Sequence, residues 1–344
     1  AAWLSGKTRP LEYRVAQLEA LGRFLEDKKQ DILEATALDM GKPSFEAYFT
    51  EILLCKNELN HTLNNLSHWM KDEHVDKNLV TQLDSAFIRK DPYGVVLIIA
   101  PWNYPIHLFL VPLIGAIAAG NCVVIKPSEI SKNTERLVAE MLTCYLDSVR
   151  SSPCPCHYPA CGHGIPTPAH TSLHAPASRP PCCGVLQCLL RAQPVSVIRA
   201  AQGAANGDRD RLAQADADTG IFPFTLQDCF AAGATASAPR PLLCSPQEVN
   251  QVLERTSSGG FCGNDTLMHV TLTSLPFGGV GNSGLGKYHG KFTFDTFSHH
   301  RSCLHRNMGL EAINSPRYPP YTQQKLGLMA ATFEIKRKGM CTLL

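Results

Sequence analysis

The hydrophobic and polar positions form helical repeats over the first seventy residues. Apolar side chains recur at spacings of three and four with charged residues between them, which is the pattern of a helix with one buried face. The first series predicts a helix over residues 9–40 that ends at Gly41-Lys42-Pro43, and the second predicts a helix over residues 44–70. The apolar positions of the two series are Leu11, Val15, Leu18, Leu21, Leu25, and then Ile52, Cys55, Leu59, Leu63, Leu66 and Met70.

The stretch Asp91–Glu129 has no charged residue between Asp91 and Lys126. An uncharged run of this length could indicate a membrane span, but prolines and glycines divide it into short pieces. Val95–Ala100 predicts a buried strand, Tyr104–Ala119 a helix with Pro105 in its first turn and Gly120 just beyond its end, and Cys122–Ile125 a second strand. This order indicates a βαβ unit with parallel strands, so we expect an α/β fold rather than a membrane span. Thr81–Lys90 predicts an extended segment before this unit, and Ser131–Leu142 a helix after it, with Ser131 as its N-cap.

Polar side chains follow each of the two predicted strands. In parallel sheets, ligands bind beyond the carboxyl ends of the strands, which places Trp102-Asn103 beside Lys126-Pro127-Ser128-Glu129. The Asn103 amide can donate to an oxygen that gains negative charge, and Lys126 with Glu129 could hold the hydroxyls of a ribose. The alternative is that Asn103 makes a turn and Lys126 is a solvated strand end. There is no G-x-G-x-x-G fingerprint.

The composition is that of a globular protein, with 44% hydrophobic and 18% charged residues, and a net charge of +2 gives no reason to expect nucleic acid as a partner. No secretory signal is visible in the first twenty residues, which predicts cytosolic synthesis and reduced thiols. Residues 148–194 differ from the rest: they hold nine prolines and six cysteines without helical or strand periodicity. We expect this segment to be disordered; the alternative is a metal site made by Cys154, Cys156, Cys161 and His163.

Ordered patterning returns near residue 247. Glu248–Arg255 predicts a helix and Met268–Thr273 a strand, and the glycine-rich Leu275–Gly286 fits either a packed structural loop or a ligand-facing one. His299 and His300 fit packing and catalytic roles equally well.

The last residues carry a lipidation signal. Lys336-Arg337-Lys338 precede Cys341-Thr342-Leu343-Leu344, which matches the C-a-a-X pattern for geranylgeranylation with a basic run beside it. One prenyl chain needs a second signal for stable anchoring, and the basic run supplies it. We therefore expect lipid attachment at Cys341 and peripheral binding to the cytoplasmic face of a membrane, such as the plasma membrane, lipid droplets or endoplasmic reticulum.

Two of these segments, Ile98–Pro105 and Ile125–Glu129, resemble the signature motifs of the aldehyde dehydrogenases. Leu275–Gly286, together with Tyr288–Lys291 and Thr296–Arg301, resembles the class 3 branch, and the tail around Cys341 with Tyr318–Tyr321 resembles its prenylated B-type subgroup. The resemblance covers roughly residues 1–147 and 247–344. It implies a Rossmann-like parallel-sheet fold, a homodimer, and NAD- or NADP-dependent oxidation of medium- to long-chain aliphatic or aromatic aldehydes to carboxylic acids.

The resemblance also implies roles for individual residues. Asn103 corresponds to the oxyanion-hole amide, and Lys126 and Glu129, with Ser128 between them, correspond to the contacts with the adenosine ribose. The remaining cofactor contacts would come from the strand end, at Ile99, Ala100, Pro101 and Trp102. No metal is expected.

Four segments that the family carries have no counterpart in this sequence. They include the loops that bring the nucleophilic cysteine and the general-base glutamate, and all would fall where residues 148–246 lie. The sequence therefore predicts three parts: residues 1–147 with the first part of the cofactor domain, residues 148–246 without family sequence, and residues 247–344 with the end of the fold and the tail. We expect impaired or absent catalysis and a low stability, with a silent, prenylated, dimer-forming scaffold as the alternative function. An out-of-frame or mis-spliced reading is the simplest origin of the middle part, and a genuine replacement is the rival.

Overall fold

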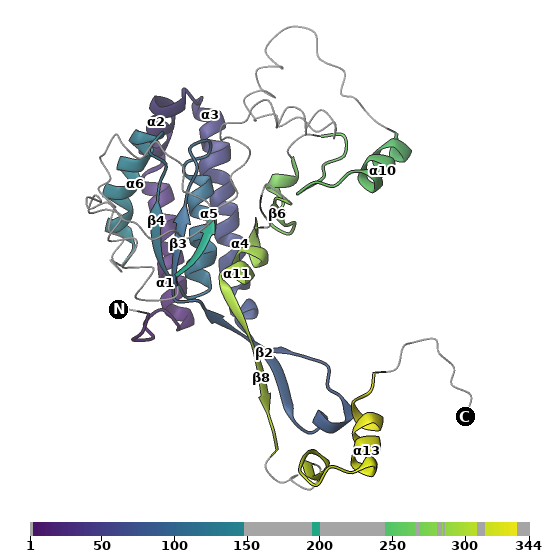
Figure 1. Ribbon diagram of the computed structural model, residues 1–344. Helices are drawn as coiled ribbons and strands as arrows, with labels where there is room; N and C mark the ends of the chain where they lie inside the picture. Colours follow the sequence, from purple (N-terminus) through teal and green to yellow (C-terminus); the bar gives the residue numbers. More distant parts are fainter. Residues whose placement is uncertain are drawn as a thin grey trace, which may run out of the picture. The chain divides into compact units, whose positions relative to one another are not determined.

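The computed structural model describes residues 3–147, 195–199, 245–265, 268–280, 284, 286–307 and 314–335. Its contacts divide the chain into two units. Unit 1 comprises Ala1–Trp69 and Pro92–Ser298, and unit 2 comprises Met70–Asp91 and His299–Leu344. Figure 1 traces the elements of both along the chain.

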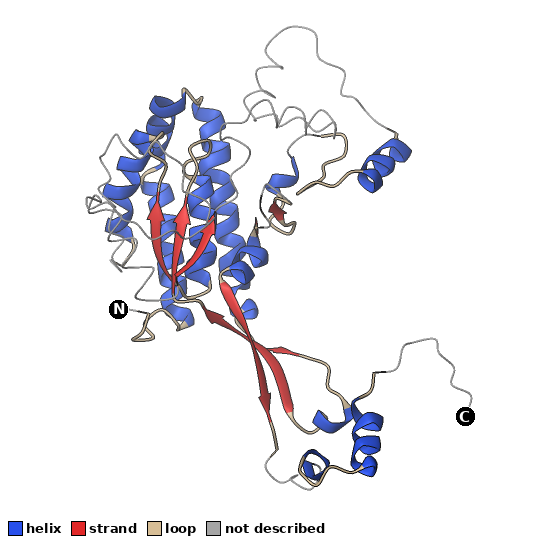
Figure 2. Cartoon of the chain, viewed as in Figure 1, coloured by secondary structure: helices blue, strands red, loops and turns tan. Residues whose placement is uncertain are grey.

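Unit 1 is built on a parallel sheet of the order β4-β3-β5. Strand β3 (Val95–Ile99) pairs in register with β4 (Cys122–Lys126), and helix α5 (His107–Ala118) connects them and contacts both. The three parallel arrows and the helices around them are visible in Figure 2. The predicted βαβ unit and the α/β fold are confirmed.

The third strand, β5 (Val195–Arg199), was not expected: it directly follows residues 148–194, which were predicted to be disordered, and lies in the part without family sequence, residues 148–246. It pairs parallel to β3, with Val195 opposite Val95 and Arg199 opposite Ile99. Its Val-Ser-Val-Ile-Arg sequence is rich in β-branched residues, which suit a strand. The other residues from 148 to 244, including the candidate metal ligands Cys154, Cys156, Cys161 and His163, lie outside the described residues.

Helix α5 begins three residues later than predicted, at His107, so Pro105 precedes the helix instead of forming its first turn. Pro112 lies inside the helix and does not break it. Gly120 follows the helix end with a φ of +90°, as expected of the residue at C′. Almost every α5 side chain is buried in protein, which explains the uncharged sequence. In the part of the chain that the structure describes, no helix has both the length and the apolarity to cross a membrane.

The N-terminal helices follow the predicted apolar series with one interruption. The series expected as one helix is α1 (Leu11–Asp27) and α2 (Lys29–Met40), separated at Lys28, and Gly41 ends α2 in the left-handed conformation. The second series is α3 (Ser44–Ala47), the π-turn η1 (Tyr48–Leu53) and α4 (Leu54–Trp69), which run on without a gap.

The buried Arg14 of α1 caps the carboxyl end of α5. Its Nη1 donates to the carbonyl of Ala118 at 2.7 Å and its Nε to the carbonyl of Thr8 at 3.2 Å. Burial lowers the pKa of Arg14 to about 10. The guanidinium thus uses the unpaired carbonyls and negative dipole end of the helix to compensate for its desolvation.

Helix α6 (Lys132–Tyr145) is capped by a side chain from α2 and not by Ser131, which occupies the N-cap position but makes no side-chain cap. The carboxylate of Asp39 accepts from the backbone N–H of Asn133 at 2.9 Å and of Thr134 at 2.8 Å, and from both their side chains at 2.8 Å. Burial opposes ionisation of Asp39, but these hydrogen bonds outweigh it and hold the pKa below its usual value.

The predicted strand over Met268–Thr273 is wrong. Met268–Thr271 forms the 3₁₀ turn η3, because the carboxylate of Asp265 accepts from the N–H of Met268 at 2.9 Å and starts a helical turn. The predicted helix is confirmed as α10 (Pro246–Arg255). Unit 1 then continues through β6 (Phe277–Gly278), its antiparallel partner β7 (Lys287–Tyr288), and α11 (Gly290–Thr296).

Unit 2 contains a three-stranded sheet of the order β1-β2-β8. Arg89 on β2 makes two hydrogen bonds to Asp72, at 3.0 and 2.7 Å. The elements of this unit are β1 (Glu73–His74), η2 (Leu79–Thr81), β2 (Ser85–Pro92), β8 (Ser298–His305), η5 (Ser315–Arg317) and α13 (Gln323–Phe333). The extended segment predicted over Thr81–Lys90 is confirmed from Ser85 onward.

The Asp39 cap gives a first prediction. Asp39→Ala removes the acceptor for two backbone N–H groups of α6, so we expect the free energy of unfolding to fall by about 1–2 kcal/mol. Ser131→Ala is the matched control and should cost less, roughly 0.5 kcal/mol, since its hydroxyl caps nothing. Because the pKa of Asp39 is lowered by folding, its contribution is present at neutral pH and is lost as the pH falls below the usual range of an aspartate. Denaturant unfolding at pH 7 and pH 3 measures both effects; equal losses in the two variants would contradict the cap.

Candidate active site

The two polar clusters predicted from the sequence meet at the carboxyl edge of the sheet in unit 1. Ile99 lies opposite Lys126 in the register, and the N–H of Ala100 donates to the carbonyl of Lys126 at 3.0 Å. The chain therefore leaves β3 toward Trp102 and Asn103 beside the point where it leaves β4 toward Glu129. This edge is where ligands bind in parallel α/β sheets.

Lys126 and Glu129 are paired with each other at this edge. Lys126 Nζ donates to Glu129 Oε2 at 2.6 Å and to the carbonyl of Pro127 at 3.1 Å. The hydrogen bond from Lys126 is the main cause that lowers the pKa of Glu129. The side chains are 50% and 73% exposed, so an ammonium donor and a carboxylate acceptor stand together where a ribose diol could reach both. The residues present thus fit a dinucleotide.

The other residues predicted to contact the cofactor could do so through their backbone groups rather than their side chains. Ala100 and Pro101 are buried, Ile99 and Trp102 are half-buried. The hydroxyl of Ser128 is buried and accepts from the N–H of Ile130 at 3.3 Å, so it shapes the turn after β4.

Asn103 is half-buried, and its side-chain oxygen Oδ1 is fully buried without a hydrogen-bond partner among the described residues. An unpaired buried amide oxygen is costly, and in a native structure such a group needs an explanation, of which a catalytic role is one. The backbone carbonyl of Asn103, in contrast, accepts from Lys42 Nζ at 3.4 Å.

Behind Asn103 lies a buried ion pair that the sequence reasoning missed. Lys42 Nζ and Glu51 Oε1 are 2.7 Å apart, and the two side chains are only 5% and 0% exposed. Lys42 also lies 4.1 Å from the centre of the Tyr104 ring. The second oxygen of Glu51 accepts from the N–H of Ile106 at 3.1 Å and of His107 at 2.8 Å, at the start of α5.

A second buried acid, Glu58, holds the segment before α11. Its carboxylate accepts from the N–H of Gly290 at 2.6 Å and lies 3.4 Å from Nδ1 of His289, which has a φ of +95°. The ring of Tyr288 lies beside those of His289 and His107, and burial raises the pKa of Tyr288. The sequence carried a signal that both acids are buried. Glu51 and Glu58 are spaced in phase with the buried face of the helix, which also includes Cys55 and Thr62, and charged residues at buried positions require partners.

None of the five cysteines in the described residues is a convincing nucleophile. Burial raises the pKa of Cys55, which suppresses the thiolate. Cys122 stands at the amino end of β4, opposite Val95, and so at the far edge of the sheet from Lys126. Cys144 bonds back to its own helix, Cys262 Sγ lies 4.0 Å from Asp265 Oδ1, and Cys303 belongs to unit 2. The other nine cysteines lie outside the described residues.

Two glycines have a structural explanation: Gly278 within the segment Leu275–Gly286, and Gly259 before it. A Cβ on Gly278 would lie 2.2 Å from the carbonyl oxygen of Gly286, and one on Gly259 would lie 2.1 Å from that of Gly278. Only glycine permits these backbone approaches. His299 and His300 are exposed on β8, so neither is a core residue.

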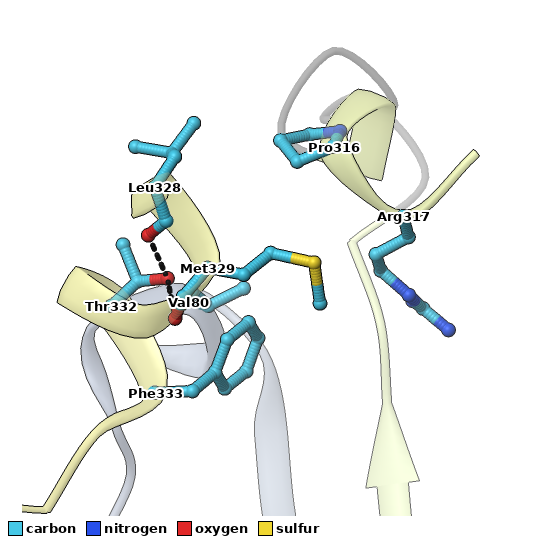
Figure 3. Close-up of a pocket in the computed structure, with 7 residues that line it drawn as sticks. All are labelled: Val80, Pro316, Arg317, Leu328, Met329, Thr332 and Phe333. Atoms are coloured by element: carbon cyan, nitrogen blue, oxygen red, sulfur yellow. Dashed lines mark hydrogen bonds between the residues drawn. The ribbon is translucent and has the colours of Figure 1, made fainter. Parts of the chain in front are cut away.

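One cavity of about 260 Å³ lies within unit 2, between α13 and η5 (Figure 3). Leu328, Met329, Thr332 and Phe333 line it from α13, with Val80, Pro316 and Arg317 completing it. It contains none of the residues predicted for catalysis or cofactor binding. Among the described residues no cluster of three or more His, Cys, Asp or Glu side chains could hold a metal ion.

Comparison with known proteins agrees with the edge-of-sheet motifs. The profile of the aldehyde dehydrogenase family matches residues 2–144. Aldehyde dehydrogenase family 3 member B1 of Bos taurus is 37% identical over 469 residues, covering 100% of this chain and 97% of the relative. The Homo sapiens member B1 is 37% identical over 456 residues, with the same coverage, and member B2 of Mus musculus is 36% identical over 446.

A solved structure gives the same fold. The substrate-bound state of Staphylococcus aureus AldH superposes with a TM-score of 0.69 at 23% identity, covering 96% of this chain and 97% of that one. The chain belongs to the aldehyde dehydrogenase family, the NAD(P)-dependent oxidoreductases of aldehydes, and within it to the B type of class 3.

The alignment with the Bos taurus relative is longer than this chain. It runs over 469 positions, whereas this chain has 344 residues, so at least 125 positions, the difference between the two, have no residue here.

His107 yields a second prediction. Burial, and then the neighbouring His289, lower its pKa to about 3, while its Nδ1 lies 3.1 Å from the carbonyl of Thr50. In the unfolded chain His107 is protonated below about pH 6.5, whereas in the folded chain it stays neutral. The free energy of unfolding therefore decreases as the pH falls from 6.5 toward 3. We expect this residue to account for about 3 kcal/mol between pH 6.5 and pH 4.

His107→Gln keeps a side-chain N–H and removes the titration. Denaturant unfolding at both pH values should show a smaller loss in this variant than in the parent chain. An identical pH dependence in the two proteins would show that His107 does not carry the effect.

Proposed function

We propose that this chain retains the cofactor edge and oxyanion donor of an aldehyde dehydrogenase but has lost the groups that perform the covalent chemistry. The observation that carries this is the contrast at one edge of the sheet: Asn103, Lys126 and Glu129 follow two adjacent strand ends, whereas burial raises the pKa of Cys55 and Cys122 lies at the opposite edge. The parent activity is the oxidation of medium- to long-chain aliphatic or aromatic aldehydes to carboxylic acids.

Each remaining residue has a definite task in that reaction. The Asn103 amide donates a hydrogen bond to the aldehyde oxygen as it becomes an oxyanion, a contribution of about 3–4 kcal/mol to the barrier. Lys126 donates to, and Glu129 accepts from, the hydroxyls of the adenosine ribose, with Ile99–Trp102 and the Ser128 turn forming the adjoining wall. A bound NAD or NADP supplies the hydride acceptor. In the part of the chain that the structure describes, no residue is assigned to attack the carbonyl or to activate the water.

We place the loss in residues 148–246, between a family-like part at 1–147 and another at 247–344. The family profile ends at residue 144, next to the change in composition, and the 125 unmatched positions are enough to hold the missing loops. The simplest origin is an out-of-frame or mis-spliced reading. Translation of the other two frames of the gene across this interval tests it: absence of the family's nucleophile and base segments there would favour a genuine replacement.

The function itself is tested by separating binding from turnover. Purified chain should bind NADH, and Glu129→Gln should weaken binding about tenfold by removing a charged acceptor. With a medium- or long-chain aldehyde and NAD or NADP, the rate of NAD(P)H formation should stay at background, because nucleophile and base act as a unit and their loss costs many orders of magnitude. Turnover above background would overturn the loss of chemistry, and absence of NADH binding would overturn the retained cofactor edge.

The second candidate is a catalytically silent, dimer-forming scaffold attached to the cytoplasmic face of a membrane. Two features favour it: the lipidation signal at Cys341, and the exposed apolar side chains of α13, where Leu326 and Leu328 are 60% and 53% exposed. The basic Lys336–Lys338 would add attraction to anionic lipids.

Membrane attachment gives its own prediction. In eukaryotic cells, Cys341→Ser should move the protein from the membrane pellet to the supernatant, since the basic run alone binds weakly. Cys144→Ser, which removes an exposed thiol elsewhere, is the matched control and should leave the distribution unchanged. A pellet fraction that is the same for both variants would exclude the prenyl anchor.

A further inference from the structure

We infer that the buried pair of Lys42 and Glu51 is a positioning device that fixes the backbone of Asn103 relative to the edge of the sheet. The inference rests on the proposed function, because holding Asn103 in place matters only if its amide is the oxyanion donor. Its target is the segment 102–106, called here the Asn103 loop, which leads from the end of β3 to the start of α5.

The pair holds the Asn103 loop at both ends. At the far end, Glu51 Oε2 accepts from the N–H groups of Ile106 and His107, at 3.1 and 2.8 Å. At the near end, Lys42 Nζ donates to the carbonyl of Asn103 at 3.4 Å and lies 4.1 Å from the centre of the Tyr104 ring. The 2.7 Å contact between Lys42 and Glu51 joins the two ends through one rigid connection.

The burial of the pair argues that it serves geometry rather than stability. Both charges are almost completely removed from water, at 5% and 0% exposure. Burying an ion pair stabilises a fold little or not at all compared with apolar side chains of the same size. What such a pair provides is a defined arrangement, since each charge demands its partner at a fixed place.

The amide of Asn103 must be held in a fixed position to act as an oxyanion donor. An oxyanion donor works only if it is held to within about half an ångström of the developing charge. The side-chain oxygen of Asn103 has no partner in the described part of the chain, so no hydrogen bond to that oxygen orients the amide there. The position of the amide then depends on the backbone of the Asn103 loop. Both members of the pair contact that backbone: Glu51 from the π-turn η1, and Lys42 from the segment between α2 and α3.

The decisive variant is the double substitution Lys42→Met with Glu51→Met in the full chain. It replaces both charges together, so no unpaired buried charge remains to unfold the protein. Hydrogen exchange of the N–H groups of Ile106 and His107 is measured relative to that of Val96–Ile98 in β3, which corrects for any change in global stability. We expect this ratio to rise about tenfold, because a charged acceptor has been removed from both groups.

A spectroscopic signal reports on the amide directly. The side-chain NH₂ resonance of Asn103, assigned by its disappearance in Asn103→Asp, should shift or broaden in the double variant as the amide samples more positions. Glu58→Gln is the matched control: Glu58 is as buried as Glu51 and accepts from the backbone of Gly290 instead. It should loosen Gly290 and leave Ile106, His107 and the Asn103 resonance unchanged.

An unchanged exchange ratio together with an unchanged Asn103 resonance in the double variant would overturn the inference and leave the pair with a structural role only. An equal response to Glu58→Gln would overturn it as well, because the effect would then not be local. If the double variant loosens the loop but the purified chain does not bind NADH, the positioning stands and the proposed function fails.

Discussion

The parallel pairing of β3 with β4 is the constraint on which unit 1 depends. A parallel pair needs a crossover connection, and here the crossover is α5, a helix that is buried almost throughout. The pairing puts Asn103 and Lys126 at one edge although they are separated by the whole helix. It also brings both ends of α5 into the interior, where unpaired N–H and C=O groups are costly. Much of the remaining architecture of unit 1 supplies partners for those groups.

Two charged side chains before residue 52 satisfy the ends of α5, and a third does the same for α6. Glu51 accepts at the start of α5, Arg14 donates at its end, and Asp39 caps the neighbouring α6. Each matches the helix dipole in sign, since acids stabilise amino ends and bases stabilise carboxyl ends. The same logic accounts for Glu58 at the amino end of α11.

The sequence predicted the elements of unit 1 better than their connections. Val95–Ile99 and Cys122–Lys126 were recognisable as strands because continuous apolar runs between turn residues have few other uses. The start of α5 was misplaced, because Pro105 favours a first turn locally and the carboxylate that actually begins the helix lies more than fifty residues away. Met268–Thr271 was misread for a similar reason, since a capping aspartate decided between two conformations that its apolar residues allow.

The candidate site was predicted in the same uneven way. Asn103, Lys126 and Glu129 follow strands and could be placed at the sheet edge from sequence alone. The role of Lys42 could not, because a lysine in Gly-Lys-Pro is read as part of a helix stop, and only the fold brings it to Asn103. The strand at Val195–Arg199 was not predicted because five residues are too few to stand out directly after residues 148–194, which have no periodicity.

The three helix-end contacts have a consequence for how the chain is made. The side chains that cap α5 and α6 all lie before residue 52, and the groups they satisfy all lie before residue 135. During synthesis, the N-terminal helices leave the ribosome before the βαβ unit does. All three helix-end contacts can form once about 147 residues have emerged. Domains generally fold in this order. The nascent chain can therefore form these capping contacts before β5 and α11, which belong to the same unit, have emerged.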